Sequence, residues 1–400
     1  MIFLYALIII AMFAQILVFM LVVRNYRYVL RKADRNRTCF CPKTALIIPC
    51  KGIDNEFEKN ISSFYALDFP DYEMIFVTES QADSAYNQLL TIKEKYQAKS
   101  KANKISIVSA GVSNQGGQKI HNLLFGCKSA QENTVIYAFA DSDACVRSNW
   151  LNELVYPLRK EKHGISSGYR WYVPQGNNLA SIALSIINAK VAQLLGATIF
   201  NLAWGGSMAL RVEDFKKLGI EKIWQNAVSD DLTLSRAVKK AGMKVYFVPA
   251  CFVATYEKYD LSRFFEFIRR QLILTRVTAP GTWIFGLITC LYSVLALWGF
   301  AAIALYLKNV NYANWYIFLL MACLSLSGQF FTASLRQKMI SEIFTADWPK
   351  LRITAIADIL LPPVWAFLML ICIIISSVGR TIEWRGIKYK LISATEAERI

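Results

Sequence analysis

Histidine is almost absent from this chain of 400 residues, which contains only His121 and His163. Catalysis or metal binding through histidine is therefore nearly excluded. The nine cysteines show no repeated C-x-x-C spacing, so the sequence predicts neither a zinc site nor, in a reducing compartment, a framework of disulfides. Internal repeats and low-complexity tracts are also lacking. Any acid–base or metal chemistry is expected to come from carboxylates.

Charge is missing from residues 2–23, and about 20 apolar residues are enough to cross the core of a bilayer. The run is longer than the apolar core of a secretory signal, so 1–23 is predicted to be an uncleaved transmembrane anchor. Residues 283–378 contain three more apolar stretches, at 283–307, 315–334 and 353–378. Between them, residues 44–260 have the mixed composition of one globular domain.

Acidic residues are outnumbered, with 29 Asp and Glu against 45 Lys and Arg and a formal net charge of +16. Such a charge can indicate nucleic acid binding. Here, however, basic residues flank the apolar runs, in the linker 24–43 and again near 336–352: Arg24, Arg27, Arg31, Lys32, Arg35, Arg37, Arg336, Lys338, Lys350 and Arg352. Juxtamembrane Lys and Arg mark the cytoplasmic side and attract anionic lipid. We therefore expect no nucleic acid partner, an anionic membrane surface and a cytoplasmic globular domain.

The last apolar stretch, 353–378, is broken by Pro362-Pro363 and carries Asp358. A single crossing here would place the basic tail 379–400 outside, against the charge rule. The stretch is therefore predicted to be a re-entrant or broken hairpin that is buried against protein. The tail would then return to the cytoplasmic face, with Trp384 and Arg385 near the active site.

The globular part alternates short apolar runs with helix-length polar stretches. The predicted strands are 44–49, 73–78, 104–109, 134–140, 164–170 and 243–248. The predicted helices are 53–66, 82–98, 116–130, 148–160 and 229–241. This alternation is typical of an α/β domain with a mainly parallel sheet, in which ligands bind beyond the carboxyl ends of the strands.

Two further segments each permit two interpretations. Residues 179–200 carry only Lys190 as a charge, and they could form a core helix or a helix that dips into the membrane and receives a lipid. In 261–282, apolar residues recur at every fourth position, at Phe264, Ile268 and Leu272. That spacing predicts either an interfacial helix in the lipid headgroups or an ordinary amphipathic surface helix.

Two pairs of acidic residues stand where chemistry is expected. Asp141 and Asp143 follow the run IYAFA at the end of a predicted strand, where alternating side chains point the same way. They could hold Mg²⁺ or Mn²⁺ against a diphosphate, or simply form a turn. Asp230 and Asp231 open a predicted helix. One of them could be the general base for an attacking hydroxyl, although the helix dipole also favours acids at this position.

Two loops could contact a nucleotide. Lys51 and Gly52 follow the first predicted strand, where an ordinary turn is the alternative. Lys119 and Asn122 lie close to a glycine-rich loop that leads into a helix, a typical place for a phosphate. Exposed loop residues without a ligand are the alternative there.

Together these segments resemble ceramide glucosyltransferases and their bacterial relatives, among the family-2-type glycosyltransferases with a GT-A fold. The resemblance runs in order through the anchor and through PCKGID, YEMIFVTESQADSA, the Lys119–Asn122 segment, FADSD, GGSMALR, SDDLTLSRAV and IEWRGIKYKL. It implies a GT-A-type domain with N-terminal and C-terminal transmembrane helices. It also implies an inverting transfer of a hexose, glucose first, from a UDP-sugar donor to a lipid hydroxyl such as that of ceramide.

The resemblance further implies roles for individual residues. Asp83 matches the first family aspartate, with Glu79 beside it, and both would contact the nucleotide. Asp141 and Asp143 form the DxD-like motif that binds donor and metal, and Asp231 matches the expected base. The acceptor and diphosphate region would include Gly205, Gly206, Arg270, Gln271, Trp384 and Arg385.

The family motif R/Q-x-x-R-W is incomplete here, because Ile273 and Leu274 stand in place of Arg and Trp. The missing arginine would help to neutralise the diphosphate and the missing indole would help to form the acceptor pocket, so a different acceptor or a slower enzyme is expected. Two other functions stay open: a processive polysaccharide synthase, and a non-catalytic lipid- or nucleotide-binding membrane protein with a decayed site. The membrane is expected to be a bacterial inner membrane rather than the Golgi.

Overall fold

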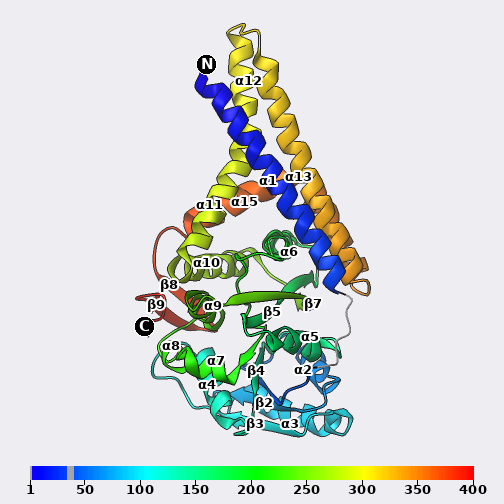
Figure 1. The fold of residues 1–400 in the computed structure, drawn as a ribbon, viewed down its shortest axis with the longest axis vertical. Coiled ribbons are helices and arrows are strands. Elements are labelled where there is room, and N and C mark those ends of the chain that lie inside the picture. The colour runs from blue at the N-terminus through cyan, green and yellow to red at the C-terminus, as the bar shows by residue number, and fades with distance from the viewer. Residues whose placement is uncertain (1, 34–39) are drawn as a thin grey trace.

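The computed structural model describes residues 2–33 and 40–400, so Arg35 and Arg37 of the predicted linker lie outside the described residues. An α/β domain forms one end of the molecule, and long apolar helices rise from it (Figure 1). In the described ranges the larger sheet has seven strands in the order β3-β2-β1-β4-β6-β5-β7. They are β1 (Thr44–Pro49), β2 (Tyr72–Thr78), β3 (Lys104–Ser109), β4 (Ile136–Ala140), β5 (His163–Pro174), β6 (Ser207–Arg211) and β7 (Lys244–Glu257).

The mainly parallel sheet is confirmed, with one strand that the sequence pattern did not predict. β6 pairs antiparallel with both β4 and β5, whereas the other neighbouring strands are parallel. Its five residues, SMALR, directly follow Gly205-Gly206 and form too short an apolar run to stand out. β5 and β7 also extend well past their predicted ends, because they pair with each other along most of their length.

Alternating side chains of the central strands pack into two apolar layers, one on each face of the sheet. Leu46 and Ile48 face one layer, and Ala45 and Ile47 face the other, as the period of a strand requires. The first layer contains α2 (Phe57–Tyr65), α3 (Ser84–Tyr96) and α5 (Trp150–Val155) with the 3-10 turn η2 (Tyr156–Arg159). The second contains α4 (Gln118–Ser129), α7 (Val212–Lys217), α8 (Ile220–Trp224) and α9 (Asp230–Lys240).

Another helical layer separates the sheet from the long helices (Figure 1). It includes α6 (Leu179–Ala192) and α10 (Leu261–Thr278). Most of α6 is buried, so the core-helix interpretation of that segment is confirmed for the helix itself. On α10, Phe264 and Ile268 pack in the same cluster as α6. The apolar stripe of α10 therefore contacts protein, and its place in lipid headgroups stays a prediction.

Among the described residues, three helical segments are long and apolar enough to cross a membrane. They are α1 (Ile2–Ala33), the run α11 (Pro280–Val294), π-turn η3 (Leu295–Gly299) and α12 (Phe300–Asn309), and α13 (Trp315–Ile343). α1 and α13 continue past the predicted ends of their apolar runs. α14 (Trp348–Leu360) and α15 (Pro362–Ile375) meet at an angle of 89°, where the two prolines predicted a break.

Asp358 of α14 is fully buried and paired. Its carboxylate accepts hydrogen bonds from Arg336 Nε and Nη2 of α13, at 2.8 and 2.7 Å, and from Gln337 Nε2 at 2.7 Å. The acid that is costly in lipid is therefore turned toward protein. This pair holds the bent segment against α13.

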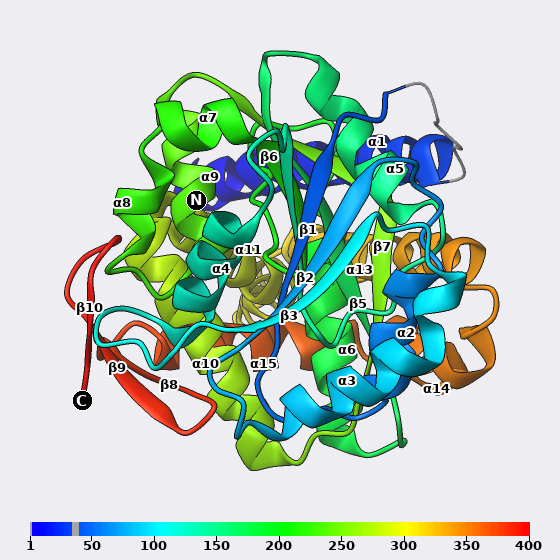
Figure 2. The ribbon, with the colours of Figure 1, turned by 90° about the horizontal axis from the view of Figure 1, so that it is seen from below.

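The tail forms a small antiparallel sheet of its own. Its strands are β8 (Thr381–Trp384), β9 (Ile387–Leu391) and β10 (Ala397–Arg399), and it lies beside α10 (Figure 2). Ile382 and Tyr389 of the tail pack against Ile273 of α10. The tail thus packs against α10, and its predicted return to the cytoplasmic face stays a prediction.

Replacing Asp358 by Asn should destabilise the protein, because Arg336 would keep its charge in a buried place without an ionised partner. Removing one partner of a buried ion pair costs about 3–5 kcal/mol. Thermal unfolding in detergent should show a lower midpoint for Asp358→Asn than for the wild type. Asp68→Asn breaks an exposed pair with Lys101 and should leave the midpoint nearly unchanged. Equal midpoints for all three proteins would contradict the proposed role of the pair.

Candidate active site

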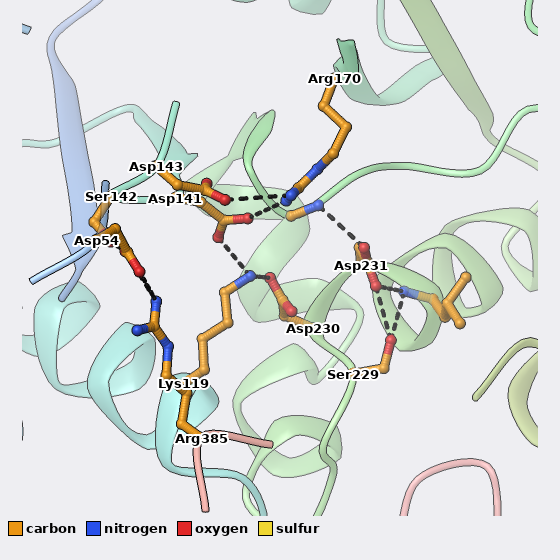
Figure 3. Close-up of polar contacts among 12 residues, drawn as sticks. Asp54, Lys119, Asp141, Ser142, Asp143, Arg170, Ser229, Asp230, Asp231 and Arg385 are labelled. Atoms are coloured by element: carbon orange, nitrogen blue, oxygen red, sulfur yellow. Dashed lines mark hydrogen bonds and ion pairs between the residues drawn. The ribbon is translucent and has the colours of Figure 1, made fainter. Parts of the chain in front are cut away.

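Lys119 joins two of the predicted acidic motifs at the carboxyl end of the sheet (Figure 3). It stands in the first turn of α4, and its Nζ lies 2.7 Å from Asp141 Oδ1 and 3.1 Å from Asp230 Oδ2. Burial alone would lower the pKa of Lys119, but Asp141 and Asp230 outweigh it and raise that pKa. The ammonium is therefore held charged between β4 and α9.

Arg170 of β5 is a member of the site that sequence patterns did not indicate. Its Nη2 lies 3.1 Å from Asp141 Oδ2, and its Nη1 lies 3.3 Å from Asp143 Oδ2. The guanidinium also donates to Tyr172 Oη at 2.9 Å and stacks on Trp204 at 4.5 Å from the ring centre. No local motif marks it, because a strand residue meets the DxD segment only in the folded sheet.

The two carboxylates of the D-x-D segment have different environments. Burial would raise the pKa of Asp141, but Lys119 and Arg170 lower it below its usual value. For Asp143, burial and the neighbouring Asp141 carboxylate together raise the pKa. The closer pairing of Asp141 accounts for this difference.

The same two residues offer oxygens that suit a divalent cation. Asp143 Oδ1 is buried and has no hydrogen-bond partner in the described part of the chain, and carboxylate oxygen is the ligand that Mg²⁺ and Mn²⁺ prefer. The described residues contain no group of three acidic, histidine or cysteine side chains that could hold a metal ion. A cation here would thus take Asp141 and Asp143 as its protein ligands and fill its other positions from substrate and water.

Asp231 is fixed by three hydrogen bonds and stays half-buried. Its Oδ1 accepts from Ser229 Oγ and from Leu232 N, both at 2.7 Å, and its Oδ2 accepts from Gly205 N at 3.1 Å. Gly205 is required at this place, since a Cβ would lie 2.3 Å from Asp230 Oδ2. These contacts orient the carboxylate toward the loop that precedes β6.

Asp230 has a different environment from its neighbour. It is 4% exposed, and burial, together with Asp231 and Asp141, raises its pKa to about 6 despite Lys119. At Gly206, a Cβ would lie 2.1 Å from the ring of Trp204, so this second glycine makes room for the indole. The pair Gly205-Gly206 therefore shapes the loop beside both acids.

The residues predicted to contact the nucleotide fall into two sets. Lys51 forms an ion pair with Glu79, and Gly52 N donates to Asp83 Oδ1 at 2.9 Å, so the loops after β1 and β2 are tied together. Asp83 also caps α3 through Ala85 N. In contrast, Asn122 is 2% exposed and uses its amide within the protein, donating to Val77 O and accepting from Gln118 Nε2. Asn122 thus fastens α4 to β2.

The tail reaches the site through Arg385. It lies at the tip of the β8–β9 hairpin, where Arg385 and Gly386 both have positive φ, as a two-residue turn of this kind requires. Its Nη2 donates to both oxygens of Asp54, at 2.7 and 2.9 Å, and Ser142 Oγ donates to the same carboxylate at 3.3 Å. Burial alone would lower the pKa of Arg385, but Asp54 raises it.

Ile273 and Leu274, at the last two positions of the incomplete R/Q-x-x-R-W motif, pack against the tail of this chain. Ile273 is fully buried and Leu274 is 9% exposed, in one cluster with Ile382, Tyr389 and Trp384 of the tail. These two residues therefore anchor the small sheet, and the different acceptor or slower enzyme expected from the missing Arg and Trp stays a prediction. Arg270 donates to Glu383 O at 2.8 Å, and burial lowers its pKa. Gln271 is exposed.

Restoring the motif by Ile273→Arg should detach the tail sheet, because an unpaired charge cannot be accommodated in this apolar cluster without a large cost. Limited proteolysis should cleave the tail of this variant faster than that of the wild type. Gln271→Arg adds the same side chain at an exposed position of the same helix and serves as the control. Protection of the tail equal to that of the wild type in Ile273→Arg would contradict the anchoring role.

Comparison with known proteins places this geometry in a family. The model of glycosyl transferase family 21 matches residues 3–397. Solved structures that the chain resembles include a mannosyltransferase from Pyrobaculum calidifontis in complex with GDP-Man and Mn²⁺, with 14% identity, a TM-score of 0.46 and coverage of 93% of this chain and 97% of that one. TarS from S. aureus in complex with UDP-GlcNAc has 13% identity and a TM-score of 0.38, with coverage of 90% and 99%. The resemblance to ceramide glucosyltransferases is thus confirmed at the level of the family.

That family match covers nearly the whole length of the chain. The chain belongs to glycosyl transferase family 21 and is a glycosyltransferase with a GT-A-like fold and apolar helices that could cross a membrane.

Proposed function

We propose that the protein transfers a hexose, most simply glucose, from a UDP-sugar to a lipid hydroxyl with inversion at the anomeric carbon. The catalytic domain would work at the cytoplasmic face of a bacterial inner membrane, on which the basic residues at the helix ends contact anionic lipid. The observation that carries the proposal is the meeting of Lys119, Asp141 and Asp230 beside the oriented carboxylate of Asp231.

The donor would lie along the carboxyl ends of β1, β2 and β4. Lys51, Gly52, Glu79 and Asp83 border the nucleotide end of this edge, and Lys119 and Arg170 border the diphosphate end. A divalent ion on Asp141 and Asp143 would neutralise part of the diphosphate charge. Lys119 and Arg170 add fixed positive charge where negative charge develops as the sugar leaves.

The base in this mechanism is Asp231. An oxygen of its carboxylate takes the proton of the acceptor hydroxyl, the hydroxyl oxygen attacks the anomeric carbon, and the bond to the diphosphate oxygen breaks. Ser229, Leu232 and Gly205 hold the carboxylate in one orientation, so little reorganisation is needed. Asp230 is unsuited to this role because its carboxylate is buried against Lys119.

A lipid acceptor is supported by the loop that leads into the site. Ile199 and Phe200 are 74% and 65% exposed, and Phe200 stacks on Phe285 of α11 with ring centres 5.9 Å apart. Only a few residues further on, Gly205 contacts Asp231. An apolar chain that lies along the long helices at Phe285 would therefore have its head close to the base.

Incubation of purified protein with radiolabelled UDP-glucose and bacterial membrane lipid tests the function directly. A labelled product that extracts into organic solvent, with a β linkage from the α donor, is the expected result. Insoluble labelled polymer would instead indicate a processive polysaccharide synthase. No incorporation with any nucleotide sugar would indicate a non-catalytic lipid- or nucleotide-binding protein.

Asp231→Asn should lower the turnover rate by about 10²–10⁴, the usual contribution of general acid–base catalysis. UDP binding should stay nearly unchanged, because Asn keeps the size of the side chain. Asp230→Asn is the matched control at the adjacent position and should slow turnover less. Equal and small losses in the two variants would show that both residues only cap α9.

Chelation of divalent ions by EDTA should abolish transfer, and added Mg²⁺ or Mn²⁺ should restore it, because the carboxylates of Asp141 and Asp143 then hold the diphosphate through a cation. Asp143→Asn should lose most activity while the protein remains folded, because Arg170 keeps its pair with Asp141. Full activity in EDTA would refute the metal assignment.

A further inference from the structure

The guanidinium of Arg170 takes the place between the two carboxylates at which a divalent cation would bind. A single side chain bridges Asp141 and Asp143, at 3.1 and 3.3 Å. This side chain is only 14% exposed, so water screens its charge poorly. A metal ion that used the free Asp143 Oδ1 together with Asp141 would still lie next to the guanidinium on the two Oδ2 atoms, and two cations at such short distance repel each other strongly. Binding of the metal ion therefore favours displacement of the guanidinium.

The charge of the cluster indicates when that displacement is favourable. Three carboxylates, those of Asp141, Asp143 and Asp230, face two cations, Lys119 and Arg170. A divalent ion added alone would bring further positive charge to Asp141 and Asp143, which Lys119 and Arg170 already pair with in a poorly hydrated site, and this is costly. The diphosphate of a nucleotide sugar brings negative charge of its own. With it, the metal, Lys119 and Arg170 can all remain in the site.

We propose that Arg170 is the resident counter-ion of Asp141 and Asp143 in the donor-free protein and yields this place only when a divalent ion arrives together with a nucleotide diphosphate. The inference rests on the metal-assisted transfer proposed above and adds an order of events to it. Arg170 then acts as a positioning residue: it keeps the metal site closed until the donor is present.

The surroundings of Arg170 give the displaced side chain a place nearby. Its Nη1 donates to Tyr172 Oη at 2.9 Å, and the guanidinium lies over Trp204. Neither contact involves the carboxylates. A small rotation would leave Arg170 attached to Tyr172 and Trp204 and turned toward the incoming diphosphate, where a bidentate guanidinium binds well. Arg170 would thus occupy the metal site in the donor-free protein and bind the diphosphate once the donor is present.

Mn²⁺ binding to the full-length protein in detergent tests this inference without an assay of activity. Free Mn²⁺ can be followed by its electron paramagnetic resonance signal, with and without UDP. In the wild type, UDP should tighten Mn²⁺ binding strongly. Arg170→Met should bind Mn²⁺ alone more tightly than the wild type does, by roughly 5- to 150-fold, the usual span of coupling between sites. The tightening by UDP should be smaller than in the wild type, because the place between Asp141 and Asp143 is then open without UDP.

Arg170→Lys distinguishes the bridging of two carboxylates from the positive charge alone. It also provides a test if Arg170→Met does not fold. Lysine keeps the charge but can pair with only one carboxylate, so its gain in Mn²⁺ affinity should be smaller than that of Arg170→Met but measurable. Arg211→Met removes another partly buried arginine, which pairs with Asp214 at 2.5 Å, and should leave Mn²⁺ affinity unchanged. Equal affinities in Arg170→Lys and wild type would overturn the bridging role.

The outcomes also distinguish this inference from the proposed function. If Mn²⁺ affinity in Arg170→Met is unchanged or weaker while Asp143→Asn loses Mn²⁺, the metal site stands and the role of Arg170 is refuted. If Asp143→Asn binds Mn²⁺ in the presence of UDP as tightly as the wild type does, the metal assignment fails, and the inference fails with it.

Discussion

The ammonium of Lys119 is the contact on which the site depends, because it holds together three segments that are far apart in the sequence. α4, the end of β4 and the first turn of α9 each contribute one charged group. A buried charge is tolerated only when it is paired, so each of these segments is constrained by the other two. The close approach of Gly205 follows from the same packing, since any side chain there would collide with Asp230 or with Lys119.

A second buried pair plays the corresponding part among the long helices. Arg336 and Asp358 link α13 to α14, and Arg336 Nη1 also donates to Gln193 Oε1 at 2.5 Å, at the end of α6. Asn25 of α1 donates to the carbonyl oxygens of Gln193 and Leu194. Polar contacts therefore link α1, α13 and α14 to the end of α6, the helix that precedes the loop to Gly205. Through this arrangement the helices fix where that loop enters the site.

The sequence was informative where a local pattern determines structure. The strands of the larger sheet other than β6 were predicted from their periodicity. Asp141 and Asp231 were proposed as site residues because strand ends and first helical turns are local positions. Arg170 was missed, since its role arises from the pairing of β5 with strands distant in the sequence. The packing of Ile273 could not be predicted for the same reason, because only the folded tail shows what covers that face of α10.

The absence of the motif arginine suggests that positive charge is lacking near the diphosphate, but other residues of this chain supply positive charge there. Ile273 buries its side chain against the tail, and the tail in turn presents Arg385 to Asp54 beside the D-x-D segment. Lys119 and Arg170 already contact the carboxylates from α4 and β5. Positive charge at the carboxyl edge of the sheet is thus supplied by a helix start, a strand and a hairpin turn. Because each of these is positioned by packing elsewhere, α10 can use its own residues to hold the tail in place.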